Sequence, residues 1–402
     1  MQLYLYILRR VIIAIPVVIC VMTITFLLVS AIPVQQRLIS TYGPPPRNVP
    51  GGYNPTVQCR LIGIPQNGSC PNPVYVRAAH RLGLDQPVVV QWGVYMWNTL
   101  TLQWGWVNNN SNAATTEPII EGHHVATVLG WFLPYTIELA FISLFLILVI
   151  TFPLGRLSAI QRNRPTDHAI RAFSFSGFAI PTYLIGAGLL IIIILAIAPG
   201  VGGRDPFCSG EGSYFLFYGS WPLPECFPGG NYPAWLANGV TSSPTGFPTV
   251  DAMIHHQWGL AADSLFRMLL PAIVITIGSV AGLLRFVRNS MLEVLNQDYV
   301  RTARSSGISE GVVVKKHAGR NSMNVVVTVL GLTFAGFLGG FPIVESVFGV
   351  KGVGLMLAES VVAPIDFGIL FGTTLLFTFI VIIANLTVDI IYAWLDPRVR
   401  LG

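Results

Sequence analysis

Six apolar runs, each long enough to cross a lipid bilayer as a helix, constrain this chain more than any other feature of its sequence. The hydrocarbon core of a bilayer is about 30 Å thick, so a helix needs about 20 apolar residues to cross it. Of the 402 residues, 53% are hydrophobic and only 10% are charged, which is too few charges to solvate a water-soluble globule. The sequence therefore predicts an all-α membrane protein with six transmembrane helices, over residues 11–32, 134–154, 173–197, 264–286, 325–347 and 368–392.

The first run is expected to remain in the membrane as an anchor. It follows Arg9 and Arg10, but it is longer than the apolar core of a signal peptide, and no small-residue cleavage pattern comes after it. We therefore count it as the first of the six spans.

The distribution of basic residues predicts the orientation of the chain. Cytoplasmic segments carry an excess of Lys and Arg, and an even number of spans places both termini on the same side. If that side is the cytoplasm, fifteen of the 23 basic residues fall in cytoplasmic segments, although the external loops are more than twice as long in total. The fifteen are Arg9, Arg10, Arg156, Arg162, Arg164, Arg171, Arg285, Arg288, Arg301, Arg304, Lys315, Lys316, Arg320, Arg398 and Arg400. The chain is thus expected to be a multi-pass protein of the cell membrane.

Two long loops, 33–130 and 198–262, are expected on the external side. They are rich in Gly, Pro, Asn and Trp, a composition typical of irregular structure or small capping lobes rather than a catalytic domain. The remaining regions are then the first helix (1–32), helices two to four with a cytoplasmic segment (131–324, with the segment at 285–324), and the last two helices with the tail (325–402).

Four of the five cysteines lie in these external loops. Because the exterior is oxidising, Cys59 with Cys70 and Cys208 with Cys226 are plausible disulfides, each closing a short loop. The alternative is four free thiols.

The cytoplasmic segment 285–324 is too polar to span a membrane and too long for a simple turn. Apolar residues recur in it at helical spacing opposite a basic face, and the pattern breaks at Gly307. Gly307 is typical of a helix stop, and Ser309 is placed to cap a following helix. The pattern predicts two short helices joined by a turn at the membrane surface. A basic amphipathic loop resting on anionic lipid is the alternative interpretation.

At this segment the sequence resembles the dipeptide and oligopeptide permeases of ATP-binding-cassette importers. DYVRTARSSGIS (298–309) is similar to the family's loop motif Glu-Ala-Ala, three residues, Gly, with Arg301, Thr302 and Ala303 in the triplet and Gly307 as the glycine. Further similar fragments occur in family order along the chain, namely RRVIIAIPVV with ITFLLVSAIP, RLGLDQPVVVQW (81–92), LPYTIELA (133–140) with PLG (153–155), ESVFGVKGVG (345–354) and DIIYAWLDPRVR (389–400).

The resemblance implies the type I importer permease fold, import of di- or oligopeptides, and a coupling helix that inserts into a groove on an ATPase subunit. It assigns that role to Tyr299, Arg301, Thr302, Ala303, Arg304, Gly307, Ile308 and Ser309. It also implies four kinds of partner: a second, homologous permease, two ATP-binding-cassette subunits, an external solute-binding protein and membrane lipid. Some relatives handle oligosaccharides or nickel instead of peptides.

This chain departs from the family in two places. HAGRN (317–321) is followed by Ser322 and Met323 rather than by the usual Leu-Pro pair. The external loops are also longer than those of the family.

Three acidic residues, Glu138, Glu345 and Asp389, lie within or at the ends of spans, where charged groups are costly and often functional. They are candidates for the transport pathway, and Glu345 lies near the external gate. For Glu138 and Asp389 the alternative is a neutral or hydrogen-bonded link between helices.

No motif for catalysis, metal binding or nucleic-acid binding is evident. The chain lacks GxxxxGK[ST], so ATP and magnesium are expected on partner subunits and this chain is not expected to be an enzyme. The pairs His123-His124 and His255-His256 have no Cys or carboxylate at ligand spacing, so no metal site is predicted. Basic residues do not cluster with aromatic ones, which argues against nucleic acid. A gradient-driven secondary transporter is a weaker alternative, because the two halves of the chain show no duplication.

Overall fold

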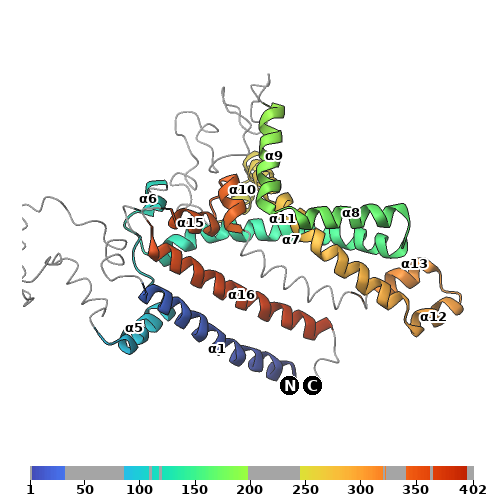
Figure 1. Cartoon of the computed structure of the whole chain (residues 1–402), viewed down its shortest axis with the longest axis horizontal. Helices are drawn as coiled ribbons and strands as arrows, with labels where there is room; N and C mark the ends of the chain where they lie inside the picture. Colours follow the sequence, from blue (N-terminus) through green and yellow to red (C-terminus); the bar gives the residue numbers. More distant parts are fainter. Residues whose placement is uncertain are drawn as a thin grey trace, which may run out of the picture. The chain divides into compact units, whose positions relative to one another are not determined.

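The computed structural model describes residues 2–31, 86–107, 111–116, 120–197, 245–319, 322, 341–362 and 365–395. Every regular element in these ranges is a helix, and one isolated bridge pairs Trp106 with His124 (Figure 1). This confirms the all-α prediction for the described ranges. The helices belong to two compact units, which are treated separately below. The first comprises Met1–Ile13, Trp131–Leu355 and Phe379–Gly402, and the second comprises Ala14–Gly130 and Met356–Thr378.

Four helices in the described ranges are individually long and apolar enough to cross a membrane. They are α1 (Gln2–Ser30), α7 (Val125–Ile160), α11 (Trp258–Leu295) and α16 (Phe367–Leu395). Some of their hydroxyl side chains are satisfied within the helix, since Thr25, Thr276 and Thr374 each donate to the carbonyl oxygen four residues earlier. Two bent helix pairs also qualify, so the described residues hold up to six crossings, in agreement with the predicted six.

The first bent pair corrects the prediction of one straight helix over 173–197. The chain instead forms α8 (Pro165–Ala179) and α9 (Thr182–Ile197), and their apolar parts meet at 98°. Pro181 lies at the break, and Ile180 has φ −94° and ψ 124°, the extended conformation that a following proline favours. The apolar composition continues through the break, which is why hydropathy alone did not reveal it.

The second bent pair falls where the fifth span was predicted, at 325–347. Residues 323–340 lie outside the described residues, and a helix over Phe341–Phe348 then meets α15 (Val353–Ser360) at 89°. Gly349 lies between them with a φ of 62°. The helix ends within one residue of the predicted end, but α15 was not predicted.

In the first unit, α11 packs against α8, α9 and the short helix α10 (Pro248–Ile254), with α8 alongside it in Figure 1. The Ser174 hydroxyl of α8 donates to the Ala281 carbonyl of α11, which fixes a close approach of the two helices. α11 begins six residues before the predicted run and continues nine residues beyond it. The predicted cytoplasmic segment therefore begins inside a long helix, and α10 lies inside the predicted external loop.

In the second unit, α5 (Val88–Leu100) packs against α1. Trp92 donates from its indole nitrogen to the Thr23 hydroxyl at 3.1 Å, and the rings of Phe26 and Tyr95 lie 5.6 Å apart. A short helix, α6 (Asn112–Thr116), follows α5. The predicted external region 33–130 thus contains ordered helices in its second half, together with the start of α7.

Candidate functional site

The predicted cytoplasmic segment forms two short helices around a left-handed glycine. α12 (Asp298–Ser305) ends before Gly307, which has a φ of 76°, and α13 (Glu310–Val312) follows and continues into a π-helical turn, η4 (Val313–Ala318). The Ile308 amide donates to the Ala303 carbonyl at 3.3 Å, and the Gly307 amide donates to the Arg304 carbonyl at 3.0 Å. This pair of bonds is the Schellman arrangement that terminates a helix at a glycine. The predicted helix stop is confirmed.

An ion pair closes the turn from the other side. Arg304 donates to both carboxylate oxygens of Glu310, at 2.8 and 3.0 Å, and so joins α12 to α13. This bidentate hydrogen bonding holds the pKa of the Glu310 carboxyl below its ordinary value. Ser309 stands at the N-cap of α13 as expected. Its backbone oxygen accepts from Val312 and Val313, but its side chain makes no capping bond.

The segment has a packed inner face and an exposed outer face. Val300, Ala303 and Val313 are buried together against Leu295 at the end of α11. Tyr299, Ile308 and Val312 are exposed. Ala303, one of the residues assigned to the coupling role, packs within the chain, and its part in that role stays a prediction. Val312, which the sequence reasoning did not select, lies on the outer face. Arg301 is also exposed, 3.6 Å from Asp298, and Thr302 donates to the Asp298 carbonyl.

The turn is attached firmly to the long helices behind it. Met291 of α11, Ala159 at the end of α7, and Val314 and Ala318 of η4 form one buried cluster. Ser290 donates to the Ser322 carbonyl at 3.2 Å, which adds a polar link. Displacement of the turn would therefore move α11 and α7 with it. The side chains of His317 and Arg320, in the HAGRN stretch that follows the motif, lie outside the described residues.

A buried carboxylate that sequence reasoning missed joins three helices, α7, α8 and α11. Asp167, in the first turn of α8, is fully buried and accepts from Ser158 of α7, from the Asn163 amide, and from Nε and Nη2 of Arg288 in α11. The two bonds from Arg288 are 2.9 and 3.0 Å long. An acidic residue in the first helical turn after Pro165, within an arginine-rich segment, was the available signal.

Glu345 is also fully buried, and both oxygens of its carboxylate accept hydrogen bonds. One oxygen accepts from the Thr136 hydroxyl at 2.8 Å and the other from the Leu355 amide at 3.0 Å, in the first turn of α15. Thr136 in turn accepts from the Val353 amide. A Cβ atom added at Gly352 would collide with this carboxylate. The motif ESVFGVKGVG is thus a helix-capping hairpin.

The other two acidic candidates are placed differently. Glu138 of α7 is buried and interacts with Thr249 of α10. Neither of its carboxylate oxygens, however, meets the geometry of a hydrogen bond with a described residue. Asp389 lies in α16, and its side chain is outside the described set. The structure does not bring Glu138 and Glu345 to one hydrogen-bonded site.

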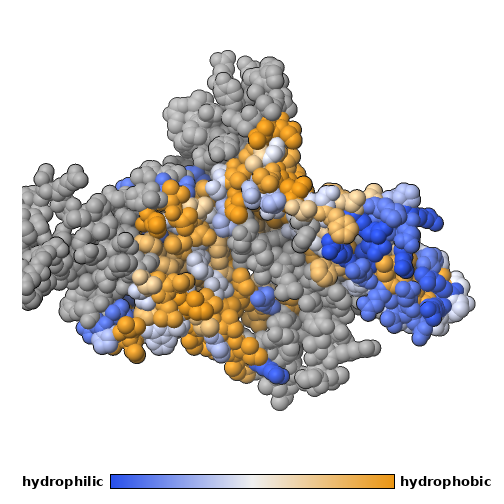
Figure 2. Space-filling view, viewed as in Figure 1, coloured by the Kyte–Doolittle hydropathy of each residue, from blue (hydrophilic) through white to orange (hydrophobic). Residues whose placement is uncertain are grey.

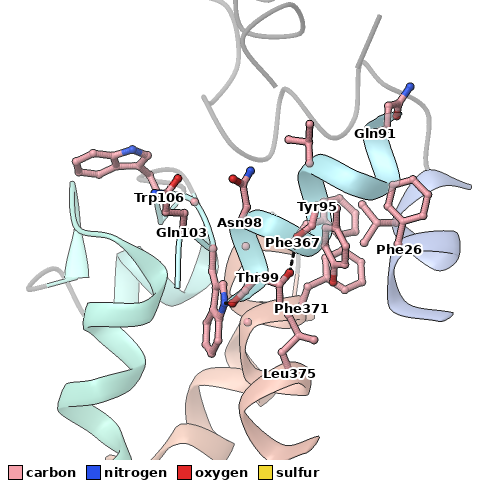
Figure 3. A pocket seen from close by; sticks show the side chains of 16 residues that line it. Phe26, Gln91, Tyr95, Asn98, Thr99, Gln103, Trp106, Phe367, Phe371 and Leu375 are labelled. Atoms are coloured by element: carbon pink, nitrogen blue, oxygen red, sulfur yellow. Dashed lines mark hydrogen bonds between the residues drawn. The ribbon is translucent and has the colours of Figure 1, made fainter. Parts of the chain in front are cut away.

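A cavity of about 220 Å³ lies in the second unit, between α1, α5 and the start of α16 (Figure 3). Its lining includes the aromatic side chains of Phe26, Tyr95, Trp104, Trp106, Phe367 and Phe371 and the amide side chains of Gln91, Asn98 and Gln103 (Figure 3). The indole of Trp104, which also lines it, donates to the Thr99 carbonyl at 3.0 Å. No sequence pattern indicated this cavity.

The remaining predicted features concern cysteines, histidines and metals. Cys59, Cys70, Cys208 and Cys226 all lie outside the described residues, so both disulfides stay predictions. His123 and His255 contact the backbone carbonyls of Glu121 and Asp251, and the ring of His124 lies against Trp106. Where the chain is described, no three His, Cys, Asp or Glu side chains group as metal ligands.

Comparison with known proteins identifies the family. The profile of the binding-protein-dependent transport system inner membrane component matches residues 151–401, which include the turn at Gly307 and the hairpin that contains Glu345. The probable D,D-dipeptide transport system permease protein of Escherichia coli strain K12 is 32% identical, over 80% of this chain and 83% of its own length.

Two further relatives extend the match. The oligopeptide transport system permease protein of Bacillus subtilis strain 168 is 29% identical over 98% of this chain and 99% of its own length. The dipeptide transport system permease protein of Haemophilus influenzae is 33% identical over 66% of this chain and 71% of its own length. These matches confirm the resemblance drawn from the motifs. The chain belongs to the family of binding-protein-dependent transport system inner membrane components.

Proposed function

We propose that this chain is the permease subunit of an ATP-driven importer of di- or oligopeptides, and that ATP is hydrolysed by partner subunits. The observation that carries the proposal is the turn around Gly307, a preformed element with an exposed apolar face and a rigid attachment to α11. It lies in the part of the chain that matches the family. The sequence has no phosphate-binding loop of its own, so ATP and magnesium belong to the ATPase partners.

In this mechanism the outer face of the turn, Tyr299, Ile308 and Val312, sits in a groove on the ATPase subunit. Exposed apolar side chains next to charged ones are typical of protein interfaces. Closure of the ATPases pushes the turn, and the cluster around Met291 passes that motion to α11 and α7. A second permease completes the path, and an external binding protein delivers the solute.

Peptides are the proposed solute because the three relatives compared above are named for D,D-dipeptide, oligopeptide and dipeptide transport. Oligosaccharide or nickel import by the same machinery is the alternative. Uptake of a labelled dipeptide into reconstituted vesicles, competed by unlabelled peptide, oligosaccharide or nickel, separates them. Peptide alone should compete, and competition by nickel or sugar alone would reassign the solute.

The proposed orientation places both termini and the Gly307 turn in the cytoplasm, as the basic residues favour. Ser306 is exposed in the turn, and Glu121 is exposed before α7. With an impermeant thiol reagent on intact cells and all five native cysteines replaced, Glu121→Cys should be labelled and Ser306→Cys should not. Labelling of Ser306→Cys in intact cells would reverse the orientation.

The outer face is tested by truncating it. Tyr299→Ala with Ile308→Ala should lower ATPase co-purification at least tenfold, because central apolar anchors often contribute 2 kcal/mol or more to an interface, roughly thirtyfold in affinity. Ile254→Ala on α10 removes an even more exposed isoleucine from outside the turn and should leave co-purification unchanged. Undiminished recovery of ATPase with the double variant would remove this face from the proposed interface.

A further inference from the structure

A second cavity, of about 110 Å³, lies in the first unit where α8 and α11 pack together. Its lining combines three guanidinium groups, Arg171, Arg285 and Arg288, with the apolar side chains of Ile170, Phe175 and Leu284. In Figure 2 the hydrophilic surface gathers over the end of this unit that Figure 1 labels α8, α12 and α13, whereas α9 is covered by hydrophobic surface. The cavity residues of α8 thus lie, along the chain, between this hydrophilic end and the apolar α9.

The arginines are held in fixed positions around the cavity. Arg288 is oriented by its two bonds to Asp167, and Arg171 donates to the His168 ring at 2.9 Å. The guanidinium carbon of Arg285 lies 4.9 Å from the centre of the Phe175 ring, in cation–π contact. Guanidinium groups fixed in this way lose little freedom when they bind an anion.

One donor at the cavity is buried and lacks a hydrogen bond. Nε of Arg171 has no partner among the described atoms, and its ion-pair distance to Asp167 Oδ1 is 3.6 Å, which is beyond hydrogen-bonding reach. The Arg171 side chain as a whole is 37% exposed, but its Nε atom is buried, so a ligand that supplies an acceptor oxygen to this atom would be stabilising. Asp167 is not free to act as the hydrogen-bond acceptor of Arg171 Nε, because it already accepts from Ser158, Asn163 and Arg288.

Exposed aromatic side chains lie on the two helices that form the site. Phe173, Phe175 and Phe286 are all exposed, on the same two helices that carry Arg171 and Arg285. Arginine next to exposed aromatic rings is the arrangement found where a membrane protein crosses from hydrocarbon to headgroups. A soluble anion would leave these rings in water, whereas an acyl chain would cover them.

We propose that this cavity binds the phosphate of an anionic phospholipid in the inner leaflet, with its acyl chains against Phe175 and Phe286. The proposal rests on the orientation given under Proposed function. Arg171 and Arg285 contact the phosphate oxygens, since guanidinium forms bidentate bonds to phosphate, and Arg288 adds positive charge behind them. The lipid would fasten α8 to α11 next to the Gly307 turn.

The test measures lipid retention on the full-length chain with its co-purified partners, by native mass spectrometry during titration with phosphatidylglycerol or phosphatidylcholine in mixed micelles. Wild type should retain phosphatidylglycerol in preference to phosphatidylcholine. Arg171→Gln with Arg285→Gln should weaken retention at least about fivefold, the effect of about one interfacial basic residue. Arg288 is left intact because its loss would strand buried Asp167. The matched control, Arg162→Gln with Arg164→Gln, removes the same charge at exposed positions outside the cavity.

Each other outcome overturns the proposal. Equal retention of the two lipids would exclude an anionic lipid site, and an equal loss in the control variant would reduce it to general surface charge. Displacement of bound lipid by inorganic phosphate or glycerol phosphate at equal concentration would assign the cavity to a soluble anion. Because the readout is bound lipid, failure of ATP-driven uptake would not alter it, and thiol labelling tests the orientation separately.

Discussion

Two turns in the first unit each join a pair of helices, but one is held by an exposed glutamate and the other by a buried one. The turn at Gly307 joins α12 to α13, and the turn at Gly349 joins the helix Phe341–Phe348 to α15, each through a glycine with positive φ. Each also uses a glutamate. At the first turn Glu310 is exposed and pairs with Arg304, whereas at the second Glu345 is fully buried and accepts from Thr136 and Leu355.

The difference shows how each turn can respond to its surroundings. An exposed ion pair is screened by water and salt and contributes little stability, so the Gly307 turn depends on its backbone geometry and inner packing. Buried donors cannot exchange a lost acceptor for water, so the second turn depends on the Glu345 carboxylate itself. The surface turn suits contact with a moving partner, and the buried hairpin suits a fixed part of the membrane scaffold.

The largest effect is expected from Glu345→Ala. It leaves the Thr136 hydroxyl and the Leu355 amide buried without their acceptor, at a cost on the order of 3 kcal/mol in the free energy of unfolding. Denaturant titration in detergent measures this change. Glu345→Gln keeps one acceptor oxygen and should lose clearly less. Equal stability of the alanine variant and wild type would mean that the carboxylate does not hold the hairpin.

A smaller effect is expected from one added methyl group. At Gly352 a Cβ atom would collide with the Glu345 carboxylate, so Gly352→Ala should destabilise the protein by about 1–3 kcal/mol. Gly311 in α13 has no heavy atom within 4 Å of an added Cβ atom, so Gly311→Ala should be neutral or stabilising by up to about 1 kcal/mol. The two alanine variants should shift the unfolding midpoint in opposite directions or by very different amounts. Equal shifts would contradict the contrast between the turns.

The smallest effect belongs to the Arg304–Glu310 pair. A double-mutant cycle with Arg304→Met and Glu310→Gln should give a coupling energy below about 1 kcal/mol, decreasing with salt. Because the pKa of Glu310 is lowered in the folded turn, the stabilisation is present above the carboxyl's unfolded pKa. It is lost as the pH falls through the lowered, folded value. A coupling energy that is independent of salt and pH would show that the pair is not exposed in solution.

The sequence predicted these regions unequally, for physical reasons. Hydropathy locates apolar length, so the spans now seen as α1, α7, α11 and α16 could be predicted. It does not register a direction change inside an apolar run, such as the break at Pro181, because the composition is the same on both sides. The end of the helix at Gly307 could be predicted because the left-handed backbone conformation there favours glycine whatever the rest of the chain does.

Long-range contacts were not readable from the sequence. Asp167 pairs with Arg288, 121 positions later in the sequence, and Glu345 bonds Thr136, 209 positions earlier. Composition and residue spacing carry no signal at such sequence separations. The burial of Ala303 was not predicted for a related reason, since the motif identifies the segment but not which side of α12 faces α11. The cavity in the second unit likewise needs three helices to meet before it exists.

The proposed coupling role of the Gly307 turn is tested most directly by the ratio of solute imported to ATP hydrolysed in reconstituted vesicles, for two substitutions of that glycine. Valine at a left-handed position is strained by about 1–2 kcal/mol and should open the turn, whereas asparagine tolerates that conformation. Gly307→Val should recruit its ATPases poorly or hydrolyse ATP without import, and Gly307→Asn should keep a ratio close to wild type. Normal import at normal ATP turnover by Gly307→Val would contradict the role assigned to residues 299–309 and would favour a loop that rests on lipid.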